Sequence, residues 1–406
     1  MELHEIKKND FMNTLWIGGM CSASYLGVYI VRNLLSVVSP QIIENSQASS
    51  ESIGYISSAF FVTYAVGQLF HGVVGDRIKA KYMVSVGLTA SAVCNWLLPY
   101  VIERETIGIW LYGVLGFFLA MIYAPMVKTI SENTSQLYAE KCNLALSFAA
   151  LLGAPVAGLI AAVISWKTAF MTVSVLVMLL GFANYVVFSV LERKRVIEYR
   201  RNISKTNGAA RGITCLLKRK IVLFTVISAL TGIVRTAVVF WLPRYLSEYL
   251  SVSSKNAALI FSGITMGISL STFVAIMIYN KLHRNMEATI LLSFAISTVS
   301  FGMLVVIRQP VVNVALIALA VMASNCASSI VWTVYCPSLY NTGLVSTATG
   351  YLDFVSYMAA AVSNAVFANA VNEIGWEKVI MVWTCIMALG IVAMVADWVH
   401  SKKKIR

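Results

Sequence analysis

Three charged side chains stand inside stretches of sequence that are otherwise apolar: Arg32, Arg235 and Asp353. A charged group near the centre of a membrane-spanning helix costs about 2.5–3.5 kcal/mol on insertion scales. Proteins keep such groups where they face a water-filled cavity, pair with each other or bind a charged ligand. A guanidinium group is planar and permanently charged, and it binds a carboxylate or a phosphate through two parallel hydrogen bonds. The arginine pair therefore predicts a clamp for a small anion.

The same residues also allow a simpler interpretation, a structural ion pair between Asp353 and either Arg32 or Arg235. One aspartate cannot neutralise two arginines, which favours the clamp. Asp353 has two interpretations of its own, because it either carries a coupling proton or pairs with an arginine. Tyr25, Tyr29 and Arg32 share one face of a helix at this spacing, so we expect both tyrosines to line the same cavity.

The elements that position these residues follow from composition. The chain has 406 residues, of which 59% are hydrophobic and only 12% charged, so a lipid bilayer is the solvent that fits. A bilayer core needs about 20 apolar residues per helix. Twelve runs meet that length: 12–40, 53–75, 82–102, 107–130, 142–165, 167–191, 221–247, 256–281, 288–308, 310–337, 344–371 and 376–398.

One long polar connection, 192–220, holds ten Lys and Arg against two Glu and divides the runs into six plus six. The sequence thus predicts an all-α membrane protein with twelve transmembrane helices in two pseudo-symmetric six-helix bundles, 1–191 and 221–406, joined by a basic linker. Lys and Arg concentrate on the side that holds both termini, which predicts cytoplasmic termini in a cell inner (plasma) membrane. The opposite side is expected to hold Arg104, Lys167, Arg244, Lys255, Arg308 and Lys378.

The two halves also repeat each other in sequence. Arg32 corresponds to Arg235 in the first helix of each half, and Tyr123-Ala124-Pro125 corresponds to Tyr335-Cys336-Pro337 in the fourth. Gly75-Asp76-Arg77-Ile78-Lys79 matches 279–283 after the second helix. Duplicated six-helix units place the substrate near the membrane midplane, so both arginines are expected to converge on one site.

Other classes of protein fit the sequence poorly. The net charge of +13 lies in short loops and not on a folded basic face, which argues against a nucleic-acid partner. The seven cysteines are scattered without a C-x-x-C pair and are expected to be reduced packing residues. We find no Walker A motif, metal-ligand cluster or nucleophile–base pair, and therefore expect neither an enzyme nor a cofactor or metal.

The segment from Gly72 to Lys81, which includes Asp76 and Arg77, resembles the loop motif of the major facilitator superfamily, with Lys79 replacing the usual second glycine. In that superfamily the motif's charges form a relay with neighbouring helix ends during the conformational change. Within it, the chain looks most like the organophosphate:phosphate antiporter family, to which glycerol phosphate transporters belong. The matching features are Tyr25-x-x-x-Tyr29-x-x-Arg32-Asn33, Arg235 followed by Trp241-x-Pro243-x-Tyr245-Leu246, Tyr335-x-Pro337 and Gly350 followed by Tyr357.

The resemblance implies that Arg32 and Arg235 bind the substrate's anionic group. It also implies a pore lined by Tyr25, Tyr29, Tyr123, Tyr335 and Tyr357, with Gln68 at the place of a family lysine. Phe148 and Gly232 replace a family histidine and tyrosine, and Asp353 replaces a glycine. The site thus loses donors and gains an acid, which favours a less highly charged anion with proton coupling at Asp353.

The expected function is secondary active transport of a small organic anion, either an organophosphate or a carboxylate. Transport occurs by antiport, with inorganic phosphate as a counter-substrate, or by proton symport. A sugar-acid symporter of the related anion:cation symporter family is the first alternative, and a transporter-like membrane sensor of an anionic metabolite is the second. The resemblance further implies a monomer in the lipid bilayer.

Overall fold

The computed structural model describes residues 2–46, 48–74, 78–198, 219–307, 309–339 and 345–405, most of them in helices. Eleven described helical stretches are long and apolar enough to cross a membrane. The last of them, Ala348–Val399, contains two of the predicted spans, because α15 breaks at Gly375, whose φ of 75° lies in the left-handed region. The predicted all-α membrane fold is confirmed.

The chain forms two compact units. Unit 1 comprises Met1–Ser49, Ala59–Ser204 and Ser254–Ser262, and unit 2 comprises Ser50–Ser58, Lys205–Ser253 and Gly263–Arg406. Each unit therefore includes a short piece of a helix that the sequence analysis assigned to the other half. The predicted domain boundaries stay a prediction, since much of the linker at 192–220 lies outside the described residues.

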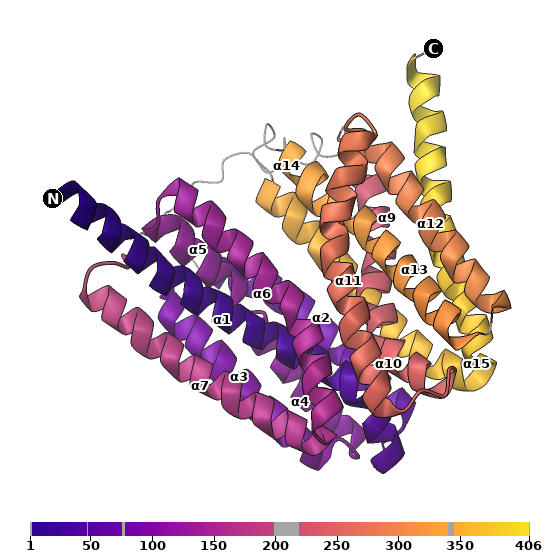
Figure 1. Cartoon of the computed structure of the whole chain (residues 1–406), viewed down its shortest axis with the longest axis horizontal. Helices are drawn as coiled ribbons and strands as arrows, with labels where there is room; N and C mark the ends of the chain where they lie inside the picture. Colours follow the sequence, from indigo (N-terminus) through magenta and orange to yellow (C-terminus); the bar gives the residue numbers. More distant parts are fainter. Residues whose placement is uncertain are drawn as a thin grey trace. The chain divides into compact units, whose positions relative to one another are not determined.

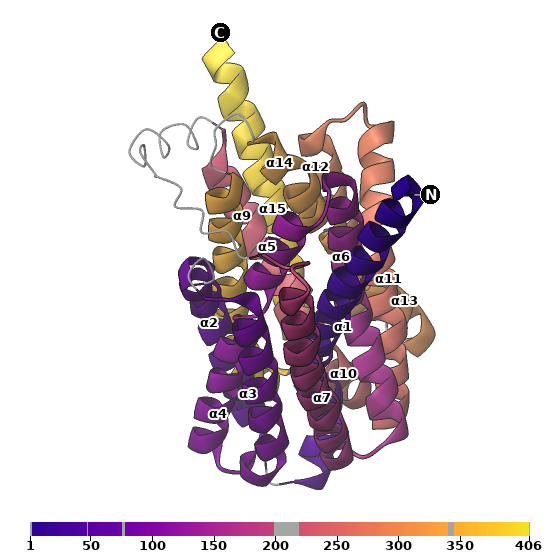
Figure 2. The same ribbon diagram turned by 90° about the vertical axis from the view of Figure 1, so that its left-hand side faces the viewer.

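Unit 1 is built around a long first helix. In Figures 1 and 2, α1 packs along α6 and α7, and α3 packs against α4 and α7. At Gly153 of α6 a Cβ atom would lie only 2.2 Å from the Cβ of Tyr29, so glycine is needed for α6 to approach α1. The helices of this unit are α1 (Glu2–Asn45), most of α2 (Ser50–Val74), α3 (Ala80–Val101), α4 (Glu105–Leu119), α5 (Tyr123–Asn133), α6 (Gln136–Val163) and α7 (Trp166–Arg193).

Unit 2 packs α9 against α15, and α12 against both α13 and α15. Figure 1 shows this group in colours that run from the pink-red of α9 through orange to the yellow of α15. Asn285 caps α12 by accepting a hydrogen bond from the backbone N–H of Ala288 at 3.0 Å, and Pro310 occupies the first turn of α13. The elements are α9 (Ile221–Gly232), η1 (Ile233–Val238), α10 (Val239–Glu248), α11 (Ser254–Lys281), α12 (Met286–Val306), α13 (Pro310–Ile330), η2 (Val331–Tyr335), α14 (Cys336–Ser338) and α15 (Val345–Ile405).

Two of these elements, η1 and η2, are π-helical turns inside longer helical spans. A π-turn widens the helix locally and is found most often at functional sites. Here η1 carries Arg235 and η2 carries Trp332. The sequence analysis anticipated neither turn.

Ion pairs connect the ends of neighbouring helices in both units. In unit 1, Glu192 near the end of α7 pairs with Lys79, and with Lys81 at 2.5 Å. In unit 2, Lys220 precedes α9 and pairs with Glu287 at 2.5 Å and with Asp397 at 2.7 Å. Burial lowers the pKa of Lys220, but the hydrogen bonds to these two carboxylates outweigh it and leave the pKa above its usual value.

Candidate substrate-binding residues

Arg32 lies half-buried on α1 among aromatic rings of unit 1. Its guanidinium carbon is 5.2 Å from the ring centre of Tyr29, 5.5 Å from that of Phe61 and 5.4 Å from that of Tyr64. A cation over an aromatic face within about 6 Å is attracted by the ring's negative face. These rings therefore stabilise a charge that the apolar helix would otherwise disfavour.

The tyrosines on the predicted face of α1 contact each other and a tyrosine of α5. Tyr25 is buried, and its ring centre lies 5.1 Å from that of Tyr29 in an edge-to-face arrangement. It also stacks on Tyr123, the first residue of α5, at 5.2 Å. The structure thus brings Tyr25, Tyr29, Tyr123 and Arg32 together, as the sequence analysis expected.

The residues that α2 contributes around Arg32 were only partly predicted from the sequence. Phe61, Tyr64 and Gln68 are spaced three and four residues apart and share one face of α2. Gln68 is half-buried one turn beyond Tyr64. Sequence reasoning selected Gln68 by resemblance and missed Phe61 and Tyr64, although their helical spacing relative to Gln68 was the signal that pointed to them.

Arg235 occupies the middle of η1 in unit 2, with 27% of its side chain exposed. Its Nη2 donates to Ser356 Oγ at 3.2 Å and lies 3.7 Å from Asp353 Oδ1, beyond ordinary hydrogen-bond length. Its guanidinium carbon is 5.6 Å from the ring centre of Tyr357 and 5.9 Å from that of Trp332. The arginine thus has one hydrogen bond to a neutral acceptor, two ring contacts and one carboxylate beyond hydrogen-bond length.

Three of the partners of Arg235 come from one face of α15, because Asp353, Ser356 and Tyr357 are spaced three and four residues apart. The backbones of α9 and α15 approach closely there. A Cβ atom at Gly232 would lie 2.3 Å from Ser356 Oγ and 2.7 Å from the Ser356 carbonyl oxygen. The glycine that replaces the family's tyrosine therefore allows Ser356 to reach Arg235.

Tyr335 lies elsewhere in unit 2. Its hydroxyl donates to the carbonyl oxygen of Arg219 at 3.0 Å, and its ring stacks on Phe224 with centres 3.4 Å apart. Phe224 precedes Arg235 by eleven residues, about 16 Å along a helix. The structure does not bring Tyr335 to Arg235, and its role in binding stays a prediction.

The residues of the loop motif are only partly visible. Gly72 lies in α2, but its surroundings, and Asp76 and Arg77 altogether, lie outside the described residues. The pairing of Lys79 and Lys81 with Glu192 next to the motif shows that basic residues of this segment contact a neighbouring helix end. The role of the motif as a conformational switch stays a prediction.

A third arginine is buried in α10. Arg244, which the sequence analysis assigned to the outer side, is only 3% exposed, and its side of the membrane stays a prediction. Its Nε donates to Glu248 Oε1 at 2.6 Å and its Nη2 to Asn372 Oδ1 at 3.1 Å. The guanidinium carbon of Arg244 also lies over the ring of Trp241, 5.4 Å from the ring centre. Close pairing with Glu248, one helical turn away, explains why this arginine is tolerated inside a buried helix.

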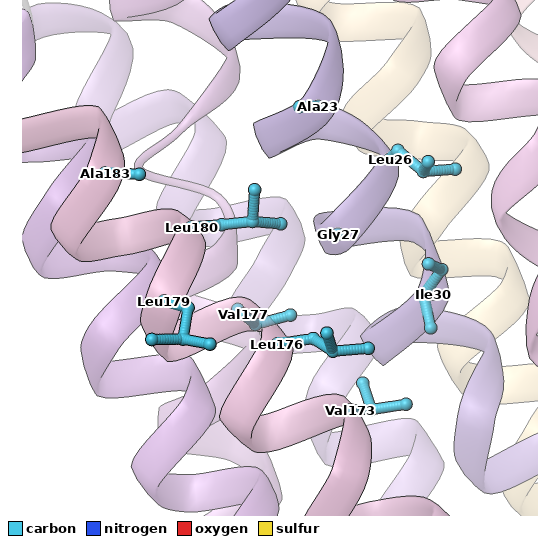
Figure 3. A pocket seen from close by; sticks show the side chains of 10 residues that line it. All are labelled: Ala23, Leu26, Gly27, Ile30, Val173, Leu176, Val177, Leu179, Leu180 and Ala183. Atoms are coloured by element: carbon cyan, nitrogen blue, oxygen red, sulfur yellow. The ribbon is translucent and has the colours of Figure 1, made fainter. Parts of the chain in front are cut away.

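A cavity of about 390 Å³ lies between α1 and α7, as Figure 3 shows. Its α1 lining faces roughly away from Tyr25, Tyr29 and Arg32. The lining offers no hydrogen-bonding side chain, so this cavity cannot bind an anion. The lining residues are Ala23, Leu26, Gly27, Ile30, Val173, Leu176, Val177, Leu179, Leu180 and Ala183.

Known proteins share this sequence pattern and fold. The family model for the Major Facilitator Superfamily matches residues 21–364. The hexuronate transporter of Bacillus subtilis (strain 168) is 24% identical over 374 residues, covering 86% of this chain and 85% of the relative. The glycerol-3-phosphate transporter of the same organism is 23% identical over 415 residues, covering 93% and 91%.

Among solved structures, the nucleoside transporter NupG has a TM-score of 0.75 at 13% identity, covering 95% of this chain and 99% of that chain. At that identity the likeness shows the fold alone. The protein is thus a multi-pass membrane protein related to transporters of anionic substrates and not to enzymes. Since the family model spans most of its length, the chain belongs to the Major Facilitator Superfamily.

Proposed function

We propose that the protein is a secondary transporter that moves a small organic anion by alternating access, with Arg32 and Arg235 binding the anionic group. The observation that supports this proposal most is the environment of the Arg235 side chain. It is held inside a membrane-capable helical stretch, partly exposed, with its paired carboxylate 3.7 Å away. That leaves hydrogen-bonding capacity for an incoming carboxylate or phosphate.

Arg244 provides an internal comparison. It is 3% exposed and bonded to Glu248 at 2.6 Å, the arrangement expected of a structural ion pair. Arg235 lies in the same membrane-capable stretch, Ile221–Glu248, yet its side chain is 27% exposed and its carboxylate contact is longer by about 1 Å. The contrast supports a binding role for Arg235 and a structural role for Arg244.

Asp353 supports proton coupling in this scheme. When ionised it competes with the substrate for Arg235, and when protonated it leaves the guanidinium to the anion. A proton and an anion would then bind together, which is symport. Antiport against inorganic phosphate is the alternative that the glycerol-3-phosphate relative keeps open.

Two further proposals concern the protein's location in the cell and its oligomeric state. The relatives are bacterial, and the Lys and Arg bias supports a plasma membrane location with both termini on the cytoplasmic side. We further propose that the protein works as a monomer. Oriented proteoliposomes with a protease-accessible terminal tag, and light scattering in detergent, test these two points.

The central test is counterflow with the purified full chain in proteoliposomes. Labelled glucuronate and glycerol 3-phosphate are suitable probes, because they represent the substrates in the relatives' names. Truncating one partner of a buried charge pair typically costs about 2–5 kcal/mol, so Arg235→Ala is expected to weaken apparent affinity at least thirtyfold, as roughly 2 kcal/mol implies. The matched control is Arg104→Ala, at an exposed position before α4.

The design separates the competing interpretations. If both arginines bind one anion, the effects of Arg32→Ala and Arg235→Ala will be strongly non-additive. Anion binding without counterflow would indicate a membrane sensor. Wild-type counterflow in Arg235→Ala, with normal insertion, would remove this residue from the binding site.

A further inference from the structure

The apolar cavity between α1 and α7 has no part in the proposed function. Its lining, drawn in Figure 3, consists only of Ala, Gly, Val, Leu and Ile residues. Leu176 and Leu179 of that lining are 49% and 60% exposed, so the cavity opens at the surface of unit 1. Both helices contain membrane-capable stretches, and the surface of such stretches meets lipid hydrocarbon. An apolar hollow of about 390 Å³ at that surface is suited to a hydrocarbon chain.

The depth of this cavity in a bilayer follows from the packing of the two helices. Asn184 Nδ2 donates to Ser24 Oγ at 3.2 Å. A Cβ atom at Gly27 would lie 3.1 Å from Leu180 Cδ1, so the two helices are antiparallel. Lys194 follows Leu180 by fourteen residues, which is about 21 Å along a helix. Half of a bilayer with its headgroups measures about 20–22 Å, so Lys194 among the headgroups places Leu180 near the midplane.

The exposed surface of α1 continues from the cavity toward the Lys194 end of α7. Trp16, Gly19 and Ala23 are spaced three and four residues apart, and Ala23 lines the cavity. Gly19 is exposed, and a Cβ atom there would meet nothing within 4 Å, which leaves open space beside the helix. Trp16 is 54% exposed and precedes Gly27 by eleven residues, about 16 Å, a depth at which tryptophan rings occupy the membrane interface. Open space at Gly19 therefore links the cavity to the interface.

Positive charge is concentrated at the interface beside this end of α7. Three exposed cationic side chains follow one another at positions 193–195. The neighbouring carboxylate of Glu192 already pairs with two lysines, so its charge is compensated elsewhere. Positions 193–198 include one acid, Glu198, against the three cations, whereas the first turn of α7 has a single cation, Lys167. Basic residues next to a membrane helix attract anionic lipid headgroups, which favours this end of α7 over the other.

We propose that this surface of unit 1 binds an anionic phospholipid. The binding site, named the α1–α7 groove, comprises Trp16, Gly19, the apolar cavity and the cationic positions 193–195. The headgroup binds the cations, and one acyl chain passes Gly19 and ends in the cavity. Two independent observations identify the occupant, because the cations select the charge of the headgroup and the apolar lining selects the chain. This inference does not rest on the proposed transport function.

The test measures which lipid occupies the groove of the purified full chain in phosphatidylcholine nanodiscs. A bimane fluorophore is attached at Val190→Cys, because Val190 is 42% exposed and follows Leu180 by ten residues, about the level of Trp16. Cys385→Ser removes an exposed thiol, and Cys215→Ser removes one that lies outside the described residues. Quenching is compared for phosphatidylglycerol and phosphatidylcholine that carry the same spin-labelled acyl chain, each added at the same low mole fraction.

The two probes share one acyl chain and differ in the headgroup, so ordinary lipid contact quenches the fluorophore equally with both. We expect phosphatidylglycerol to quench about threefold or more strongly than phosphatidylcholine when the groove is unaltered. Arg193→Gln, Lys194→Gln and Arg195→Gln combined should bring this ratio to about one, because the anionic headgroup loses its partners. Lys167→Gln, at an exposed position at the opposite end of α7, is the matched control and should leave the ratio unchanged.

A second set of variants separates binding in the groove from diffuse attraction to the cations. Gly19→Leu keeps every charge but fills the open space beside α1, so the ratio should fall about twofold or more. Gly263→Leu is its matched control, because Gly263 is also exposed and a Cβ atom there would meet nothing within 4 Å. Ala23→Leu narrows the cavity itself, should act as Gly19→Leu does, and replaces that variant if it fails to insert.

Each result counts for or against the phospholipid site. A ratio near one in the unaltered groove means that the groove takes any lipid, which overturns the proposal. A preference for phosphatidylglycerol that persists in both Gly19→Leu and Ala23→Leu reveals attraction by charge alone and also overturns it. The same holds if Gly263→Leu or Lys167→Gln lowers the ratio as much as the groove variants do. Loss of the preference in the glutamine and groove variants alone supports the site, whatever counterflow shows for organic anions.

Discussion

Asp353 is the negative charge that an anionic substrate must displace at Arg235, so Asp353→Asn gives a defined prediction. At the observed 3.7 Å between Oδ1 and Nη2, two unit charges attract by about 1 kcal/mol in bulk water and about 4 kcal/mol at an effective dielectric constant of about 20. The side chains are 27% and 24% exposed, and the contact exceeds hydrogen-bond length. We therefore take about 1–2 kcal/mol as the attraction that the anion must overcome at Arg235. Its loss in Asp353→Asn corresponds to about five- to thirtyfold tighter anion binding.

Lowering the pH should change the anion affinity of the wild type in the same direction as Asp353→Asn does. Protonating Asp353 removes its charge just as the amide does, so wild-type affinity for the anion should rise once the pH is low enough to protonate this carboxylate. The Asn variant should keep the low-pH affinity at every pH. Arg235 from η1 and Cys336 from α14 lie close enough to Asp353 to interact with its charge.

Binding is measured with the purified chain at pH 5.5 and 7.5, using labelled glucuronate or the better competitor found in counterflow. Glu373→Gln is the control, because it removes an exposed carboxylate from the same helix, α15. Exchange of anion for anion should survive in Asp353→Asn, while proton-driven accumulation should be lost. A variant whose affinity and pH profile match the wild type would show that Asp353 does not compete for Arg235.

Two further predictions concern packing and helix ends. Gly232→Ala should cost about 1–3 kcal/mol of stability by overpacking and also weaken anion binding, because its Cβ would press on Ser356; Gly350→Ala, with nothing within 4 Å, should leave both unchanged. Equal behaviour of these two variants in thermal unfolding and ligand binding would contradict the described α9–α15 contact. Lys220→Met should lower stability by about 1 kcal/mol relative to the exposed control Lys378→Met. Because the folded-state pKa of Lys220 is raised, the loss should be constant from pH 6 to 9 and disappear only in strong alkali, above the usual lysine range, so a loss that fades between pH 6 and 9 would refute the ion-pair account.

Much of the architecture was predictable because membrane insertion imposes simple rules. Hydrocarbon demands long apolar helices, so the spans can be counted from composition. The last two predicted spans appear as one helix broken at Gly375, a residue whose positive φ ends one helix and starts the next. The burial of Arg244 could not be predicted in the same way, because proximity to a span end does not reveal whether an arginine reaches water or a partner such as Glu248.

The candidate site was predictable only where spacing carried the information. Tyr25, Tyr29 and Arg32 were grouped by helical periodicity, and the proximity of Asp353 to an arginine was one of two interpretations that the sequence left open. Trp332 was missed because its position depends on a π-turn, which leaves no periodic signal. Tyr335 was included by resemblance, and its neighbours Phe224 and Arg219 can be seen only in three dimensions.

The π-turn η1 has a consequence for how this chain is compared with others. A π-turn is in effect one extra residue accommodated inside an α-helix, and one residue corresponds to about 100° of helical rotation. Relatives without the turn should therefore align with a single-residue gap near Ile233–Val238, and an alignment that forbids the gap will misassign the residues on one side of it. Deleting one residue there would turn one flank of the helix relative to the other, which changes the side chain presented to Ser356 without altering any other part of the sequence.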